Sequence, residues 1–452
     1  MQDYFITKSI IIMSIFRAYD IRGIYGKELT NEIAERIAKA FVNLLHSKNT
    51  VVGMDVRTSS PELKRSVIKG LISQGCNVVD IDLVPIPLFY YFIVKYKMKA
   101  GIYVSGSHDP LGYNGLKLCR EKSIDLTYES GIEKIEKLYK KNYPDKKNGE
   151  IIKKDISDEY KKQLLKKFKF KKPLHVVIDA GNGCWSKIAP EIFEELGFKV
   201  TKLFCKFDGS FPNRPPEPLE RNLKELKNKV KKLKANLGIA YDVDGDRVVF
   251  IDEKGKYVHP DFTLMLFAIE VLKKNDALVT TIVCTKTLEK LARKFGWKIS
   301  WVRVGRSYVK QKMFKTKAVL GGEISGHYFF KKDNDYDDGL YASLMLAKIL
   351  IKENKPLSYL INKLPYHPSV DLRINCKENK KSKVIEFIKK KFKNYKLTLI
   401  DGVGINLKHG FVLVRPSNTE EKLELKIEAE TKSKLEKIKK KIERNIKLAM
   451  KN

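Results

Sequence analysis

Three segments of this chain repeat one plan, and that repeat limits the possible folds more than any other feature. Each segment consists of an apolar strand, a polar loop, an amphipathic helix, a glycine and a second apolar strand. The segments span residues 51–81, 175–200 and 278–299, and their glycines are Gly75, Gly197 and Gly296. Strands that alternate with helices of this length predict parallel strand pairs joined by right-handed crossovers. The chain therefore predicts three similar α/β units.

The C-terminal part follows a different pattern. Strands are expected at Leu397–Ile400, Gly410–Val414 and Leu423–Ile427, before a lysine-rich helix, which predicts a separate α+β domain. Lysine-rich stretches at 140–154 and 352–356 are candidate linkers. The predicted domains are residues 14–150, 151–254, 255–366 and 367–452, after an N-terminal extension, 1–13. Because Met13 directly precedes the patterned sequence, we expect residues 1–12 to be a mis-assigned start rather than structure.

Charge and cysteine usage exclude several classes of protein. The chain has 89 Lys and Arg against 54 Asp and Glu, a net charge of +35, which raises nucleic acid or an anionic membrane as partners. The lysines are spread along helices and linkers without interleaved aromatic residues, so we expect a solvated face and no nucleic acid partner. Six cysteines without paired spacing predict neither disulfides nor a zinc site. No apolar run approaches the roughly 18 residues needed to span a bilayer, and we expect a cytoplasmic protein.

A concentrated anionic group is formed by three carboxylates spaced two residues apart, Asp242, Asp244 and Asp246. Oxygen ligands without nearby His or Cys are typical of a Mg²⁺ or Ca²⁺ site. A calcium-binding EF-hand is excluded because its sixth position, which requires Gly, is Arg247, and the next residues form a strand-like apolar run. The alternative to a metal site is an acidic turn between two strands.

Ser107 lies in a polar loop, Val104–Pro110, that follows an apolar run and is expected to be exposed. The G-x-S-x-G signature of hydrolases is missing because position 109 is Asp, which disfavours acyl transfer. Ser107 could instead carry a phosphoryl group if His108 and a metal neutralise the developing charge. The alternative is an ordinary turn residue.

Two further loops present groups suited to sugars and phosphates. One offers carboxylate, hydroxyl and imidazole groups, and the other offers a guanidinium, hydroxyls and an amide, which suit a phosphate dianion. The residues are Glu323, Ser325 and His327 in the first loop, and Arg415, Ser417, Asn418 and Thr419 in the second. Each loop alone could also be a polar turn.

The order of these four loops resembles the α-D-phosphohexomutase superfamily, one loop per domain over almost the whole chain. The opening motif Phe16–Gly23 is similar to that family's N-terminal motif as well. The resemblance implies three similar mixed α/β domains, with helices flanking the sheets, and a fourth, TATA-binding-protein-like α+β domain around a central cleft. It also implies a phosphohexomutase that works through a phosphoserine enzyme and a bound hexose 1,6-bisphosphate.

The resemblance assigns the catalytic residues as follows. Ser107 would be the phosphoserine, Arg247 would assist beside the metal, and His108 and Lys117 would lie beside the transferring phosphoryl group. Lys117 or His327 could serve as general acid or base. The metal would be one Mg²⁺, held by a phosphoserine oxygen and three carboxylates: Ser107, Asp242, Asp244 and Asp246.

The substrate residues implied by the resemblance line the cleft, bind the sugar hydroxyls or hold the phosphate that is not reacting. They are Tyr19 and Arg22 in the cleft, Glu323, Ser325 and the neighbouring His327 at the sugar, and Arg415, Ser417, Asn418 and Thr419 at the phosphate. The chain departs from the family pattern at Val283, where bacterial members have Lys, at Glu421, a common Pro position, and at Arg306, where many have His. We expect Arg306 to supply the lost cation to the substrate.

The substrate is predicted to be mannose phosphate, glucose phosphate or both, because Ile324 and Asn418 match phosphomannomutase/phosphoglucomutase enzymes. Phosphoglucosamine mutases, the alternative, usually carry Gln and Gly at these positions. Two rival classes are a nucleic-acid-binding protein and a metal-dependent phosphatase with an aspartate nucleophile. The expected partners are sugar phosphates, with no nucleic acid and no membrane, and the enzyme is expected to be a monomer or homodimer.

Overall fold

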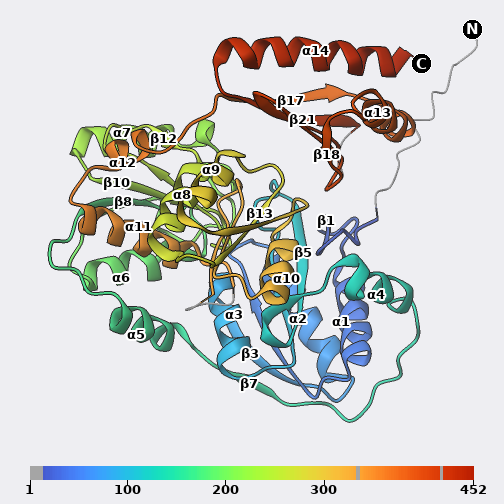
Figure 1. Ribbon diagram of the computed structural model, residues 1–452. Coiled ribbons are helices and arrows are strands. Elements are labelled where there is room, and N and C mark those ends of the chain that lie inside the picture. Colours follow the sequence, from blue (N-terminus) through green and yellow to red (C-terminus); the bar gives the residue numbers. More distant parts are fainter. Residues whose placement is uncertain (1–13, 332–335, 418–420, 452) are drawn as a thin grey trace, which may run out of the picture. The chain divides into compact units, whose positions relative to one another are not determined.

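The computed structural model describes residues 14–331, 336–417 and 421–451 (Figure 1). The described chain forms two compact units. The first comprises the residues up to Val84 and Phe92–Asp155, and the second comprises Pro85–Tyr91 and everything from Ile156 onward. The predicted mis-assigned start, residues 1–12, lies outside the described residues.

A seven-stranded mixed sheet forms the centre of the first unit. Strand β2 pairs in parallel with β3 and β4, and β4 pairs antiparallel with β5. In sheet order the strands are β1 (Ile21–Ile24), β5 (Tyr113–Arg120), β4 (Ala100–Val104), β2 (Asn49–Met54), β3 (Asn77–Leu83) and β7 (Ile151–Lys153), with β6 (Ile124–Asp125) paired to β5. The helices are α1 (Asn31–Leu45), α2 (Ser60–Ile72), α4 (Glu133–Leu138) and the end of α3 (Ile86–Lys95).

Strand β7 corrects the predicted linker over residues 140–154. Its three residues pair in parallel with β3, so the end of that lysine-rich stretch is part of the first sheet, beyond the predicted domain border at 150. The pairing is possible because a short edge strand needs backbone hydrogen bonds on one side only, although it leaves Ile151 and Ile152 exposed.

The glycines of the repeated plan have the role that the sequence indicates. Gly75, Gly197 and Gly296 have φ of 78°, 87° and 73°. This left-handed conformation ends a helix at little steric expense only when the residue is glycine. The strand pair flanking each helix is parallel, namely β2 with β3, β8 with β9, and β13 with β14. The predicted α/β repeat is therefore present three times.

Three sheets organise the second unit. The first two continue the α/β plan with three parallel strands each; the first adds two antiparallel strands and the second adds one. In sheet order the strands are β12 (Tyr257–Val258), β11 (Val248–Ile251), β10 (Leu237–Tyr241), β8 (His175–Asp179) and β9 (Lys199–Leu203), then β14 (Lys298–Val302), β13 (Ala277–Thr281), β15 (Leu320–Gly322) and β16 (Tyr328–Phe330). Their helices are α5 (Ser157–Lys167), α6 (Ile188–Glu195), α7 (Lys224–Leu233), α8 (Pro260–Val271), α9 (Thr287–Phe295), α10 (Arg306–Thr316), α11 (Gly339–Glu353) and α12 (Leu357–Asn362). Strand β12 lies beyond the predicted border at 254.

The last sheet is antiparallel, and α13 and α14 cover one of its faces (Figure 1). The lysine-rich helices bury an apolar stripe there, including Val384 and Ile446. Phe411 and Leu413 pack instead with Ile282, which precedes α9. In sheet order the strands are β17 (Ser369–Asn375), β21 (Lys422–Ala429), β20 (Gly410–Pro416), β19 (Val403–Leu407) and β18 (Lys396–Thr398), with helices α13 (Glu378–Lys391) and α14 (Lys432–Lys451). The predicted α+β pattern is confirmed, although β17 and β19 were not predicted.

Among the helices in the described residues, none combines the length and hydropathy needed to cross a membrane.

Candidate active site

The Ser107 loop follows β4 in the first unit. Ser107 is 2% exposed, so the expectation of an exposed loop is wrong for this residue. Its φ of 47° is left-handed, an unfavourable conformation for a serine. The backbone N–H of Ser107 donates to the hydroxyl of Ser105 at 2.7 Å, and Nδ1 of His108 lies 3.4 Å from Oγ of Ser107. The neighbouring groups thus fix a strained serine beside an imidazole.

The buried guanidinium of Arg57 holds this loop through hydrogen bonds to its backbone carbonyls. Nη2 donates to the carbonyl of Ser107 at 2.9 Å, and Nη1 donates to the carbonyls of Pro110 and Tyr113 at 3.1 and 3.0 Å. Asp55 accepts from the N–H of Gly106 at 3.2 Å. Hydrogen bonds from a charged donor are worth about 1.5–3 kcal/mol each, so this cluster can offset the backbone strain at Ser107.

Other predicted residues of the first unit gather at the same loop. Arg22 on β1 donates to the carbonyl of Gly106 at 3.2 Å and lies 3.0 Å from the carboxylate of Asp109. Burial acts to lower the pKa of Arg22, but Asp20 and Asp109 outweigh it and the net direction is upward. Tyr19 is half-buried and acts electrostatically on Arg22. Lys117, on β5, is 4% exposed.

The aspartate loop joins β10 to β11 in the second unit, as predicted. All three carboxylates are fully buried, and an oxygen of each lies within 4.8 Å of the other two. Oδ1 of Asp242 accepts from the N–H groups of Gly245 and Arg247 at 3.0 and 3.1 Å. These backbone bonds orient the first carboxylate, as is usual for a metal ligand.

Gly245 makes this tight turn possible. Its φ is 83°, and a Cβ there would lie 2.2 Å from Nε1 of Trp185. The indole instead donates to the carbonyl of Gly245 at 2.9 Å. The loop therefore needs a residue with no side chain at this position.

The donor set fits a hard divalent cation. Three buried carboxylates this close repel one another strongly in a low dielectric, and a cation of charge +2 removes that repulsion. Oxygen-only ligands favour Mg²⁺ or Ca²⁺ over zinc. Asp242, Asp244 and Asp246 can therefore hold the predicted Mg²⁺.

Arg247 and His327 meet beside the aspartate loop. Nε of Arg247 donates to Nε2 of His327 at 3.0 Å and lies 3.8 Å from Oδ2 of Asp242. Nη1 of Arg247 donates to Glu217 at 3.3 Å. Burial acts to lower the pKa of Arg247, but Asp242, Asp246 and Glu217 outweigh it and raise the pKa. The structure thus brings together two residues that are 80 positions apart in the sequence.

Arg306 is buried beside Asp337. Nη1 of Arg306 donates to Asp337 at 3.1 Å, Nη2 donates to the hydroxyl of Tyr90, and Nε lies 3.8 Å from Asp246. Nδ1 of His327 lies 2.6 Å from the same Asp337. Burial alone would raise the pKa of Asp337, but Arg306 and His327 hold it below its usual range. The guanidinium of Arg306 is thus bound by protein groups, and its contact with a sugar phosphate stays a prediction.

The loop that is predicted to bind the sugar, residues 323–327, turns between β15 and β16. Glu323 is 5% exposed, its Oε1 accepts from the N–H of Gly305 at 3.0 Å, and its Oε2 accepts from the hydroxyl of Ser325 at 3.4 Å. The carbonyl of Gly326 accepts from the N–H of Val248 at 3.1 Å, which ties this loop to the strand after the aspartates. Glu323 and Ser325 are therefore held together near the metal loop.

The predicted phosphate loop is only partly within the described residues. Arg415 is held by two carboxylates, since Nη1 donates to Asp401 and Nη2 to Glu424, both at 2.6 Å. Ser417 is 4% exposed, and its carbonyl accepts from Lys381 at 2.8 Å. Asn418 and Thr419 lie outside the described residues. The bonds from Nε, Nη1 and Nη2 to these two carboxylates use three of the five N–H donors of Arg415, which leaves one on Nη1 and one on Nη2 for a phosphate.

Sequence reasoning missed Arg57, Glu217 and Asp337. Arg57 follows β2 in a polar run with Asp55, and polar residues at the end of a parallel strand were a usable signal. Glu217 and Asp337 carry no such local signal, because their roles depend on which strands pair.

Comparisons with known proteins identify the family of this chain. Four family models match the chain in order, each described as a domain of phosphoglucomutase/phosphomannomutase. They are α/β/α domain I at residues 13–146, α/β/α domain II at 158–255, α/β/α domain III at 259–367 and the C-terminal domain at 373–445.

Similar whole proteins are known as well. The chain is 38% identical over 436 residues to a phosphomannomutase/phosphoglucomutase of Pseudomonas aeruginosa, covering 94% of each chain. It is 35% identical over 442 residues to a phosphoglucomutase of Neisseria gonorrhoeae, covering 95% of each. A crystal structure of a phosphoglucomutase/phosphomannomutase family protein from Burkholderia thailandensis superposes with a TM-score of 0.90 at 34% identity, covering 96% of this chain and 97% of that one.

Proposed function

This chain belongs to the phosphoglucomutase/phosphomannomutase family of mutase enzymes, and we propose that it interconverts the 1-phosphate and 6-phosphate of a hexose. The observation that carries the proposal is the group of three buried aspartates, with oxygens within 4.8 Å of one another, beside Arg247. Such a group is suited to phosphoryl transfer. An ordinary acidic turn does not need three buried carboxylates this close together.

Ser107 is proposed as the residue that carries the phosphoryl group. The Ser107 oxygen–phosphorus bond breaks as a free hydroxyl of the hexose monophosphate forms a new oxygen–phosphorus bond. A base takes the proton of that hydroxyl, and the released Ser107 oxygen takes up a proton. The hexose 1,6-bisphosphate then returns its other phosphoryl group to Ser107, which completes the isomerisation. Arg22 beside the loop supplies positive charge close to the transferred group.

Lys117 is the base that we favour. Nε2 of His327 accepts a hydrogen bond from Arg247, and Nδ1 lies 2.6 Å from a carboxylate oxygen of Asp337. A ring held in this way is suited to positioning Arg247 rather than to exchanging a proton with the sugar. The role of Lys117 rests on its place on β5 next to the Ser107 loop and on the family resemblance.

Mg²⁺ would be held by Asp242, Asp244 and Asp246, and when bound it would supply Lewis-acid stabilisation of negative charge on the transferred phosphoryl group. The backbone N–H groups of Gly245 and Arg247 keep Asp242 oriented for this task. A phosphoserine oxygen of Ser107 is predicted as a further metal ligand. Because Ser107 belongs to the first unit and the three aspartates to the second, this stays a prediction.

The proposed substrates are mannose and glucose phosphates. Glu323 and Ser325 are proposed to bind the sugar hydroxyls, and Arg415 and Ser417 to bind the phosphate that is not reacting. The names of the similar proteins favour these hexoses over glucosamine phosphate. A cytoplasmic location, a monomeric or homodimeric state and the lack of a nucleic acid partner stay predictions.

A coupled assay tests the proposal directly. Mannose 1-phosphate, glucose 1-phosphate and glucosamine 1-phosphate are supplied with Mg²⁺ and glucose 1,6-bisphosphate, and the 6-phosphates are measured. We expect turnover of the two neutral sugars and loss of it in Ser107→Ala. Activity on glucosamine phosphate alone would replace the substrate assignment, and release of inorganic phosphate by an active Ser107→Ala variant would favour a phosphatase.

A further inference from the structure

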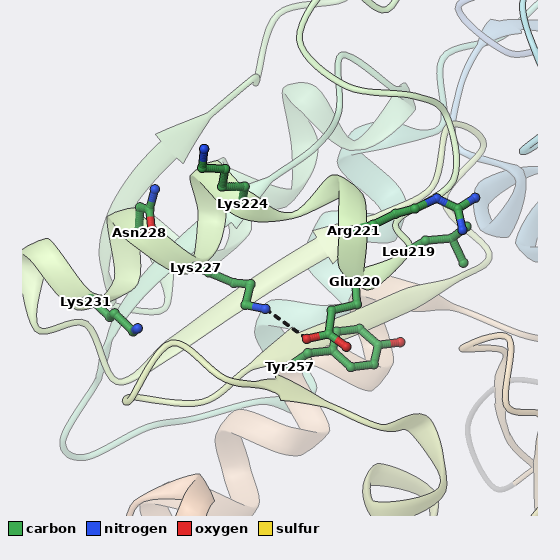
Figure 2. A pocket seen from close by; sticks show the side chains of 8 residues that line it. All are labelled: Leu219, Glu220, Arg221, Lys224, Lys227, Asn228, Lys231 and Tyr257. Atoms are coloured by element: carbon green, nitrogen blue, oxygen red, sulfur yellow. Dashed lines mark hydrogen bonds and ion pairs between the residues drawn. The ribbon is translucent and has the colours of Figure 1, made fainter. Parts of the chain in front are cut away.

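A hollow of about 710 Å³ opens on the surface of the second unit, between helix α7, strand β12 and the short 3-10 helix η4 (Glu220–Asn222). None of the predicted active-site residues that the structure describes lines it. Its floor includes the half-buried ring of Tyr257. Figure 2 shows Lys227 reaching Glu220 next to this ring. We call this region the α7 hollow.

Four cations and one carboxylate line the α7 hollow. Lys227 pairs with Glu220 at 2.9 Å, and this ion pair neutralises both groups. The side chains of Arg221, Lys224 and Lys231 have no ion pair or hydrogen bond with any other residue that the structure describes. The hollow therefore carries three uncompensated positive charges.

Helix geometry concentrates the lysines on one side. Lys224, Lys227 and Lys231 are three and four residues apart and share one face of α7, while the opposite face buries Leu226 and Val230. Like charges at this spacing repel one another and destabilise the helix. A bound anion would turn the repulsion into attraction.

The spacing of the cations selects the kind of anion. From Lys224 to Lys231 the helix rises about 10 Å, which exceeds the reach of one phosphate group. Burial raises the pKa of Tyr257, so its hydroxyl keeps its proton and can donate a hydrogen bond to an anion. We propose that the α7 hollow binds a small polyanion that carries two or more linked phosphate groups, supplied by an inorganic polyphosphate or by a nucleotide.

Calorimetric titration of the full-length protein with inorganic triphosphate, in EDTA, tests the proposal. The informative variant is Lys224→Ala/Lys231→Ala. Its matched control is Lys229→Ala/Lys232→Ala, which removes the same charge from the same helix at positions that do not line the hollow. Thermal melting and the mutase assay confirm that both variants are folded.

We expect the first variant to bind triphosphate roughly tenfold more weakly, about 1.4 kcal/mol, and the control to bind within about twofold of the wild type. Equal weakening in both variants would mean attraction by the overall charge and would overturn the proposal. Retention of affinity in both, or no binding by the wild type, would overturn it as well.

A second titration with ATP identifies the source of the phosphates. Tighter binding of ATP than of triphosphate, lost in Tyr257→Leu, supports a nucleotide whose base lies against the ring. Equal affinity, with the same dependence on Lys224 and Lys231, supports a bare phosphate chain. If the affinity for ATP does not change when Lys224 and Lys231 are replaced, the nucleotide binds elsewhere, and the proposal is contradicted for nucleotides.

Discussion

His327 accepts a hydrogen bond through Nε2 from Nε of Arg247, at 3.0 Å. An arginine Nε can only donate, so Nε2 carries no proton. The proton of a neutral ring is then on Nδ1, which faces Asp337 at 2.6 Å. His327 therefore helps to fix the guanidinium of Arg247 beside Asp242.

Replacing His327 should show that it positions Arg247. We expect His327→Ala to lower kcat about 10–100-fold with little change in KM, because an outer partner of a metal site is lost. His327→Gln, whose carbonyl can accept from Arg247, should recover part of the loss. Steady-state kinetics over a range of pH measure both. Equal losses of kcat in His327→Ala and His327→Gln, together with the disappearance of one limb of the pH profile, would instead make His327 the proton-transfer group.

Replacing Arg57 should release the Ser107 loop. Arg57→Lys keeps the charge but cannot reach three carbonyls at once, so we expect a loss of about 2–4 kcal/mol in stability. We also expect slower phosphorylation of Ser107 by glucose 1,6-bisphosphate, followed by intact-protein mass spectrometry. The control is Arg65→Lys, an exposed arginine of α2, expected to stay within about 0.5 kcal/mol. Unchanged phosphorylation in Arg57→Lys would refute the positioning role.

A comparison of two glycines separates the effect of backbone strain from that of a steric clash between an added Cβ and a neighbouring side chain. Gly26 and Gly245 both have positive φ, 78° and 83°, but a Cβ meets nothing within 4 Å at Gly26 and lies 2.2 Å from Trp185 at Gly245. Gly26→Ala should therefore be destabilised by only about 1–2 kcal/mol. Gly245→Ala should lose more than that, and its thermal shift with Mg²⁺ should shrink because the aspartate loop must move. Similar melting temperatures for the two variants would contradict this account.

The candidate loops could be predicted from the sequence because each one is a local pattern. Apolar runs ended by polar residues locate Ser107 after β4, Asp242 after β10 and Glu323 after β15. The spacing of Asp242, Asp244 and Asp246 shows three oxygen donors in one turn without any knowledge of the fold.

The partners of those loops could not be predicted, since they depend on strand pairing and packing. Arg247 meets His327 because the turn before β16 lies against β11, which no pattern in either segment indicates. Arg306 was expected to supply a cation to the substrate, yet its guanidinium binds Asp337 and Tyr90. Burial of Ser107 likewise depends on what packs around its loop rather than on the loop's own polar composition.

Asp338 should make the stability of the second unit depend on pH. It caps α11 by accepting from the N–H of Tyr341 at 2.9 Å, and it also accepts from the hydroxyl of Tyr160. Burial raises the pKa of Asp338 from 3.8 to about 6, although both hydrogen bonds oppose the change. The folded protein thus holds this proton more tightly than the unfolded chain does. The stability contributed by protonated Asp338 is fully present below pH 3.8 and is lost as the pH rises through about 6.

Asp338→Asn removes this titration and keeps the cap, since Asn is as good a capping residue as Asp. Near pH 4 the variant should match the wild type, and by pH 8 it should be more stable by roughly 3 kcal/mol, the free energy of ionising the buried carboxyl group. Chemical unfolding of both proteins at several pH values measures the difference. Asp158→Asn, at an exposed position in α5, serves as the control and should give a flat difference. A pH-independent offset in Asp338→Asn would mean that Asp338 is already ionised at pH 4, and that the hydrogen bonds from Tyr160 and Tyr341 outweigh its burial.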